Sequence, residues 1–303
     1  MPDLAHGEGE AEERVLSRLR LAFLLTVVIL AVEAVGAFGS RSLSLTVDAV
    51  HNVPDLLAFG VSFYALAGTR EGSSPTFTFG THRFEVFAGV LNGVLVLGTG
   101  VVFGYTAFGS LAGRGSFAGP VNALWLLAAV APTLVLRSVN LRQLERIPGR
   151  IRDLNLRSVV LHLAADIAIT LALLVDGVIL LLRPSLAAVD AGAALLIALV
   201  LVVESYPLLR DGWVVLTEGV PRGLSMARIQ ASVLEVPGVA SVHDVHVWAV
   251  CSTLVCMTAH VEVQDMSVHE SMGLIADLRG RMEREFGIVH STFELEAAAR
   301  RSS

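Results

Sequence analysis

Hydrophobic residues occupy the first two thirds of the chain in long runs, which short polar segments interrupt. A helix needs about 20 mostly apolar residues to cross a bilayer. Six runs meet that requirement, at residues 20–39, 43–67, 86–109, 119–138, 157–182 and 186–208. The pattern predicts an all-α transmembrane domain of six helices over residues 20–210, with a cytoplasmic lead at residues 1–19.

Arginine residues are distributed unevenly among the segments that separate these runs. If the N-terminus lies inside, the outer segments contain only Arg41, Arg114 and Arg183. The remaining arginines near the helix ends, Arg137 among them, then fall on the inner side. Because cytoplasmic loops are enriched in basic residues, we expect a multi-pass protein of the cytoplasmic membrane with both termini in the cytoplasm.

Beyond residue 210 the hydrophobic pattern changes and polar residues become frequent. Amphipathic helices are predicted at residues 225–239 and 267–286, and alternating strands at residues 241–250, 254–263 and 290–296. This α-β-β-α-β order predicts a cytoplasmic α+β domain over residues 211–297, with two helices on one sheet. Residues 298–303 are expected to form a disordered tail.

The composition supports a membrane protein and argues against nucleic-acid binding. Of 303 residues, 54% are hydrophobic and only 17% are charged, so we expect membrane lipid to surround the helices. No basic stripe alternates with aromatic side chains, as nucleic-acid binding would require. The two cysteines, Cys251 and Cys256, are expected to be a reduced, partly buried pair in a strand hairpin.

Two of the predicted membrane helices carry ionisable side chains, which are costly inside a bilayer. Asp48, His51 and Asp55 are spaced i, i+3 and i+7 and therefore share one face of the second helix. His162 and Asp166 repeat the i, i+4 spacing of His51 and Asp55 in the fifth helix. A single pair of this kind could be a structural contact between helices, but two copies on separate helices favour a shared site.

Two imidazoles and two carboxylates are a suitable ligand set for one divalent ion. Zinc takes four nitrogen, sulfur or oxygen ligands in a tetrahedron, and two facing helices can supply four convergent side chains. The two negative charges are neutralised by a dication, which makes the site tolerable in the membrane. Mixed imidazole and carboxylate ligands favour zinc or a neighbouring metal over magnesium or calcium, which prefer oxygen ligands alone.

The same ligands provide a mechanism for coupling metal movement to protons. Imidazole titrates near physiological pH, so an empty site takes up protons and a bound metal displaces them. Metal and protons then compete for one site. Exposure of that site to each side of the membrane in turn would exchange one for the other.

Several other polar residues lie on or near these stripes. Asp48 and Asn155 are candidates for partners that orient the ligands, and for Asp48 a polar contact between helices is an equal alternative. Asp176 and Asp190 lie near the outer ends of the fifth and sixth helices, where we expect interfacial positions. Pro54, next to Asp55, is expected to alter the geometry of the second helix.

Seven segments together resemble the cation diffusion facilitators of the zinc transporter type. They are VDAVHNVPD at 47–55, TFGTHRFEVFAGVLN at 78–92, NLRSVVLHLAADI at 155–167, VDAGAALLIALVLVVES at 189–205, GVASVHDVHVW at 238–248, TAHVEV at 258–263 and HSTFELE at 290–296. The resemblance extends over nearly the whole chain. It implies six membrane helices, a cytoplasmic ferredoxin-like (metallochaperone-like) domain, a homodimer, and proton-coupled export of divalent metal by alternating access.

The resemblance also assigns roles to particular residues. His51, Asp55, His162 and Asp166 match the transport site of the family, and this His-Asp version is associated with zinc and sometimes with cadmium or cobalt. The protein is then a secondary active transporter rather than an enzyme. Zinc is the substrate and protons are the counter-ion.

A second metal site is implied in the C-terminal domain. The matching residues are His243, His260 and Glu296, with His290 as a further candidate. Metal bound there would lower the repulsion between two acidic domains and would act as a regulatory ligand. Alternatively, the residues of the first motif only pack and form hydrogen bonds around Trp248.

Two other functions remain open at this point. A membrane metal sensor or partner subunit would bind zinc without moving it, and only a flux measurement separates it from an exporter. A membrane metalloenzyme would require a general base and an open metal position. The chain lacks an H-E-x-x-H pattern, and four protein ligands would leave no position for water.

Overall fold

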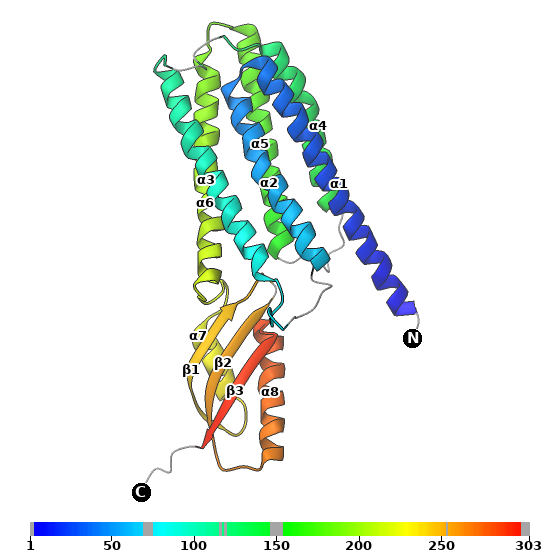
Figure 1. Cartoon of the computed structure of the whole chain (residues 1–303), viewed down its shortest axis with the longest axis vertical. Helices are drawn as coiled ribbons and strands as arrows, with labels where there is room; N and C mark the ends of the chain where they lie inside the picture. The colour runs from blue at the N-terminus through cyan, green and yellow to red at the C-terminus, as the bar shows by residue number, and fades with distance from the viewer. Residues whose placement is uncertain are drawn as a thin grey trace. The chain divides into compact units, whose positions relative to one another are not determined.

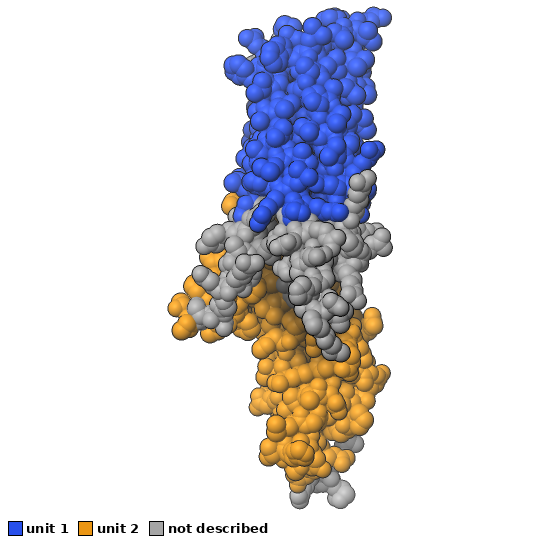
Figure 2. Space-filling view, turned by 90° about the vertical axis from the view of Figure 1, so that its right-hand side faces the viewer, with its two compact units in different colours: residues 1–60, 92–206 blue, residues 61–91, 207–303 orange. Residues whose placement is uncertain are grey.

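The computed structural model describes residues 3–68, 75–114, 117, 120–145, 154–252 and 254–297. The chain divides into two compact units (Figure 2). The first comprises residues 1–60 and 92–206, and the second comprises residues 61–91 and 207–303.

The first unit is built from long helices, three of which extend beyond its bounds (Figure 1). The helices are α1 (Asp3–Ser40), α2 (Leu43–Gly68), α3 (Arg83–Leu111), α4 (Ala123–Glu145), α5 (Leu154–Leu182) and α6 (Ala188–Leu216). The six predicted helices are therefore present. Helix α1 already begins within the expected lead, and α6 continues past residue 210.

Within the described residues, five helices are long and apolar enough to cross a membrane: α1 from Arg20 onward, and α3, α4, α5 and α6. Helix α2 is not among them, because its apolar run is interrupted by polar residues such as Asp48, His51 and Asn52. Helix α2 also continues through Pro54. One of the two helices that carry the predicted ligands thus has an interrupted apolar run.

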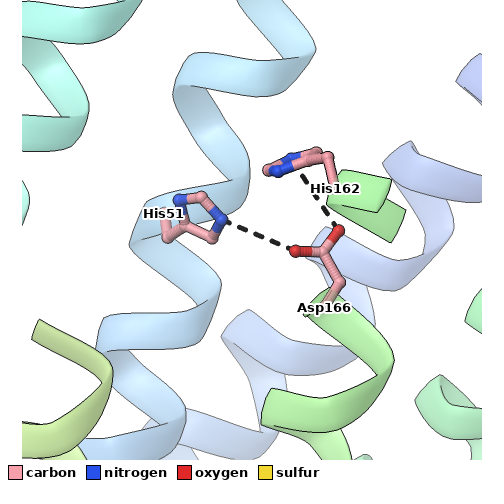
Figure 3. Close-up of side chains that lie close together, drawn as sticks. All are labelled: His51, His162 and Asp166. Atoms are coloured by element: carbon pink, nitrogen blue, oxygen red, sulfur yellow. Dashed lines mark ion pairs between the residues drawn. The ribbon is translucent and has the colours of Figure 1, made fainter. Parts of the chain in front are cut away.

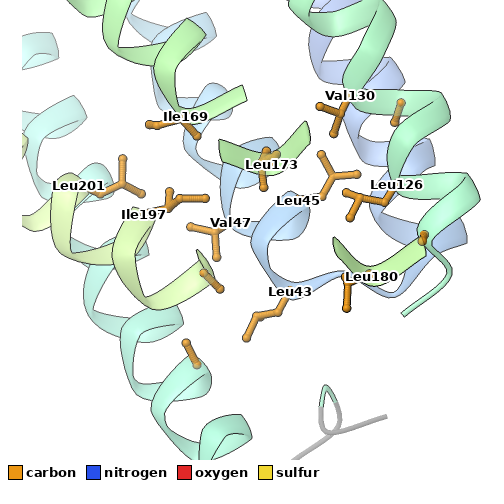
Figure 4. Packing of buried hydrophobic residues seen from close by; sticks show 14 of the residues in the cluster. Leu43, Leu45, Val47, Leu126, Val130, Ile169, Leu173, Leu180, Ile197 and Leu201 are labelled. Carbon is orange, nitrogen blue, oxygen red and sulfur yellow. The ribbon is translucent and has the colours of Figure 1, made fainter. Parts of the chain in front are cut away.

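The core of this bundle brings together α2, α4, α5 and α6 (Figure 4). Its buried side chains include Leu43, Leu45, Val47, Leu126, Val130, Ile169, Leu173, Leu180, Ile197 and Leu201. Because lipid is as apolar as these side chains, close packing and internal hydrogen bonds hold such helices together rather than exclusion of water. The core therefore fixes the position of α2 against α5.

The start of α2 is capped by a carboxylate from another helix. Asp190 of α6 accepts a hydrogen bond from the backbone N–H of Leu43 at 2.7 Å and lies 2.7 Å from the Ser44 hydroxyl. The Ser44 hydroxyl also lies 3.1 Å from Asp176 of α5. Both aspartates are buried among the helices, and their expected position near the membrane interface stays a prediction. Their polar partners at the first turn of α2 stabilise them inside the bundle.

Replacing Asp190 with alanine should destabilise the protein by about 1–3 kcal/mol, because buried donors at the start of α2 lose their acceptor. The midpoint of thermal unfolding in detergent measures this loss. Asp190→Asn keeps one carbonyl oxygen as an acceptor and should lose less. Equal unfolding midpoints for Asp190→Ala and the wild type would contradict the capping role.

The second unit contains a small α+β domain. Its elements are α7 (Met226–Leu234), β1 (Val239–Ala249), β2 (Val255–Val263), α8 (Val268–Phe286) and β3 (His290–Ala297), in the predicted α-β-β-α-β order. The sheet order is β1-β2-β3, with β1 antiparallel and β3 parallel to β2. Helix α8 makes the crossover that a parallel pair requires. Neither of the two cysteines is in a disulfide, and both are buried near the β1–β2 turn.

One face of this sheet packs against the two helices. Ile229 of α7 and Leu278 of α8 share a buried core with Met257, Ala259 and Val261 of β2. Side chains alternate across a strand, so the residues between these point to the opposite face. Polar side chains of β2 and β3 therefore gather on the face that the helices do not cover.

Candidate metal centres

Helices α2 and α5 bring three of the four predicted transport ligands together (Figure 3). The Asp166 carboxylate lies between the two imidazoles. His51 Nε2 is 3.7 Å from Asp166 Oδ1, and His162 Nε2 is 3.9 Å from Asp166 Oδ2. The two imidazole rings meet edge to face, with centroids 5.7 Å apart.

The spacing of these groups fits a metal ion. Ligands 2.0–2.1 Å from a tetrahedral ion lie about 3.3 Å from one another. The ligand atoms of His51, His162 and Asp166 all lie within 4.8 Å of one another, so small shifts would bring them onto one ion. His51 is only 1% exposed, whereas the His162 side chain is 36% exposed. The cluster is therefore enclosed on the α2 side and accessible on the His162 side.

Two predicted residues of this site fall outside what the structure describes. The side chains of Asp55 and Asn155 are not among the described ones, although both residues lie in helices. Asp55 follows His51 by one helical turn on α2, as Asp166 follows His162 on α5. Its role as the fourth ligand remains a prediction.

A buried ion-pair cluster next to this site was missed by the sequence analysis. Arg137 of α4 lies 3.0 Å from Glu33 of α1 and 3.2 Å from Asp48 of α2. The amide of Asn52 donates a hydrogen bond to Glu33 at 2.6 Å. The assignment of Arg137 to the inner flanking segments was therefore wrong, because its side chain is 2% exposed among the helices.

Glu33 could have been noticed from the sequence as an acidic residue within an apolar run. Asp48 was expected either to orient a ligand or to make a contact between helices. Its described ion pair is with Arg137, which makes it an interhelical contact. A buried charge requires a partner of opposite sign, and the bundle supplies one cation for the two carboxylates.

The second predicted site lies on the uncovered face of the small sheet. His243 Nε2 is 3.1 Å from Glu296, and His260 Nδ1 is 2.6 Å from the other oxygen of the same carboxylate. The two imidazole rings stack with centroids 5.3 Å apart. His243 pairs with His260 in the β1–β2 register, and the strand alternation places Glu296 on the same face. Three of the four predicted residues therefore meet.

The fourth candidate, His290, does not join this cluster. His290 pairs with Cys256 in the β2–β3 register, and its ring contacts Phe79 at 5.7 Å. Carboxylates that the prediction left out take part instead. Glu262 groups with His243 and Glu296, and Glu294 groups with His260 and Glu296. His290 was thus the wrong additional candidate, because strand register decides which side chains are neighbours.

The carboxylates around His260 change how this cluster holds protons. The hydrogen bond that His260 donates to Glu296, together with the charges of Glu294, Glu296 and Asp244, raises the pKa of His260. The bond to His260 in turn lowers the pKa of Glu296. At mildly acidic pH the cluster therefore holds a protonated imidazole against an ionised carboxylate.

Zinc binding by this cluster should strengthen as the pH rises, because a metal ligand must be a neutral imidazole. With the pKa of His260 raised, proton competition persists to a higher pH than for an ordinary histidine. Zinc titrations of the His162→Ala variant, with the membrane site impaired, should show this dependence between about pH 6 and 8. Adding His260→Ala should remove it, and an unchanged pH dependence would contradict the assignment.

The geometry defines a class of protein: a polytopic membrane protein with metal-ligating side chains inside its bundle and a second such cluster in an α+β domain. Residues 19–217 match the model of the cation efflux transmembrane domain. Residues 221–298 match the model of the cation efflux protein cytoplasmic domain. The chain therefore belongs to the cation diffusion facilitator family.

Several characterised proteins are similar over almost the entire chain. The metal cation efflux system protein CzcD of Cupriavidus metallidurans is 30% identical over 92% of this chain and 86% of its own length. The cadmium, cobalt and zinc/H(+)-K(+) antiporter of Bacillus velezensis is 25% identical over 98% of this chain and 93% of its own length. The proton-coupled zinc antiporter SLC30A8 of Xenopus tropicalis is 26% identical over 92% of this chain and 78% of its own length.

A solved structure is similar over a shorter stretch. The metal-bound C-terminal domain of the CzcD transporter from Cuprividus metallidurans covers 24% of this chain and 99% of its own. It is 33% identical, with a TM-score of 0.22.

Proposed function

We propose that the protein exports zinc from the cytoplasm in exchange for protons, with cadmium and cobalt as further substrates. The observation that carries this proposal is the meeting of His51 from α2 with His162 and Asp166 from α5 inside a membrane bundle. The antiporters to which the chain is similar are named for zinc, cadmium, cobalt and protons, which agrees with this ligand set.

The mechanism follows from the charges of the site. His51, Asp55, His162 and Asp166 hold one dication, whose charge balances the two carboxylates. When the metal leaves, the imidazoles take up protons, which keeps the site close to neutral in a medium where net charge is costly. If the site binds metal while it is open to the cytoplasm and binds protons while it is open to the other side, the protein exchanges metal for protons. Both the metal-bound site and the protonated site hold α2 and α5 together.

The organisation of the protein follows from the same proposal. Residues 20–210 form the transport domain and residues 211–297 the cytoplasmic domain, with the lead at 1–19 and the tail at 298–303. Both termini are cytoplasmic, and the protein resides in the cytoplasmic membrane as a homodimer surrounded by lipid. The family of the cytoplasmic domain supports dimer formation.

The cluster on the sheet of the cytoplasmic domain is a regulatory zinc site in this proposal. His243, His260 and Glu296 are its ligands, and Glu262 and Glu294 add negative charge around it. Zinc would reduce the repulsion between the acidic faces of two such domains. The cytoplasmic zinc concentration would thereby influence the arrangement of the dimer.

Flux across sealed vesicles tests the proposal. Purified protein is reconstituted into liposomes with an imposed pH gradient, and zinc entry is followed with an internal fluorescent indicator. We expect zinc to move opposite to the proton gradient and to stop when the gradient is collapsed. Zinc binding without flux would instead indicate a membrane metal sensor or a partner subunit, and turnover of a substrate would indicate an enzyme.

A further inference from the structure

One side chain of α4 joins the two helices that carry the membrane metal ligands. Nη1 of Arg137 donates a hydrogen bond to the backbone oxygen of Asp166 at 2.8 Å and another to Thr170 Oγ1 at 2.6 Å. Nη2 lies 3.2 Å from Asp48 of α2 and 3.0 Å from Glu33 of α1. The guanidinium therefore faces α5 with one nitrogen and α1 and α2 with the other.

The contacts to α5 occur at the residue that supplies the metal-binding carboxylate. The backbone oxygen of Asp166 also accepts a hydrogen bond from the Thr170 hydroxyl at 2.8 Å. Thr170 thus accepts from Arg137 and donates to Asp166, which closes a small hydrogen-bonded ring. In a water-poor interior such linked bonds restrain the groups that form them. The turn of α5 that carries Asp166 is held at this point.

The contacts to α2 occur one helical turn before His51. Asp48 and His51 are three residues apart, so they lie on the same face of α2. Restraining Asp48 therefore restrains the turn that presents His51. Asn52, beside His51, is held in the same network through Glu33 of α1.

We propose that Arg137 is a positioning residue for the membrane metal site and sets the spacing between the ligands of α2 and those of α5. The proposal rests on the proposed function, because it assigns the metal of that site as the species whose binding responds. Arginine suits this role because its planar fork carries separate nitrogens that can bond two helices at once. Lysine would keep the charge but would offer a single nitrogen to both.

Two conservative variants test the proposal. Arg137→Lys keeps the buried positive charge and loses the fork, and Thr170→Val removes only the hydroxyl that links Arg137 to Asp166. Loss of a group that orients metal ligands typically weakens metal binding by roughly 10- to 100-fold. We expect both variants to weaken zinc binding and to raise the KM of zinc flux by about that factor, with a smaller change in kcat.

A charge-matched double variant separates positioning from charge balance. Arg137→Gln alone leaves Glu33 and Asp48 without their cation and should lower the unfolding midpoint. Glu33→Gln with Arg137→Gln restores the net charge of the cluster and should recover stability. We expect the KM for zinc to remain raised in the double variant, because the contacts to α5 are still lost.

The control is Arg142→Gln, which removes a charge from an exposed position of the same helix and should leave zinc binding unchanged. Wild-type zinc affinity and KM in both Arg137→Lys and Thr170→Val would overturn the proposal. Recovery of KM together with stability in the double variant would also overturn it. His162→Ala distinguishes failure of this proposal from failure of the proposed function: if His162→Ala leaves zinc flux intact, the proposed function itself fails.

Discussion

Replacing His162 with alanine is expected to abolish zinc flux while the protein still folds. His162 Nε2 lies 3.9 Å from Asp166, and the side chain is partly exposed, so alanine removes a ligand without opening the packed core. Loss of a group that only orients a ligand lowers metal affinity or activity by roughly 10- to 100-fold. Loss of a ligand itself should therefore lower zinc flux by more than about 100-fold. The measurement is the initial rate of zinc entry into proteoliposomes under a fixed pH gradient.

His269→Ala is the matched control, because His269 is an exposed histidine of α8 outside both clusters. It should transport zinc at the wild-type rate. Size-exclusion profiles and unfolding midpoints of both variants establish that the fold is intact. Wild-type flux in His162→Ala would remove the membrane cluster from the transport mechanism.

Replacing His51 with aspartate is expected to change which metals are carried. The variant exchanges an imidazole for a third carboxylate, and carboxylate oxygens favour harder ions such as manganese. We expect the ratio of manganese flux to zinc flux to rise roughly tenfold, which corresponds to about 1.4 kcal/mol of differential binding. Competition between the two metals for flux in the same vesicles measures this ratio directly.

The same substitution adds a negative charge at a position that is 1% exposed. Because an unbalanced buried charge is costly, the variant should hold an additional proton when the metal is absent. His51→Asn is the control that removes the imidazole without adding charge, and it should lose zinc flux without gaining manganese flux. Identical metal profiles for His51→Asp and the wild type would contradict the link between ligand type and selectivity.

The sequence alone was sufficient for the architecture. Membrane helices follow from the length and apolarity of a single segment, and the α-β-β-α-β order follows from local periodicity, so neither requires knowledge of distant contacts. The meeting of His51 with His162 and Asp166 was also predictable, because an i, i+4 pair of ionisable residues in each of two membrane helices requires a shared partner. The predicted role of Asp55 rests on that spacing alone.

The tertiary structure decided which residues become neighbours across elements. Asp190 caps α2 from a helix nearly 150 positions away in sequence, and Arg137 reaches Glu33, Asp48 and Asp166 from a fourth helix. In the small domain, strand register excluded His290 from the cluster and admitted Glu262. Periodicity determines the face on which a side chain lies. Only the packing of helices and the pairing of strands determine what that face meets.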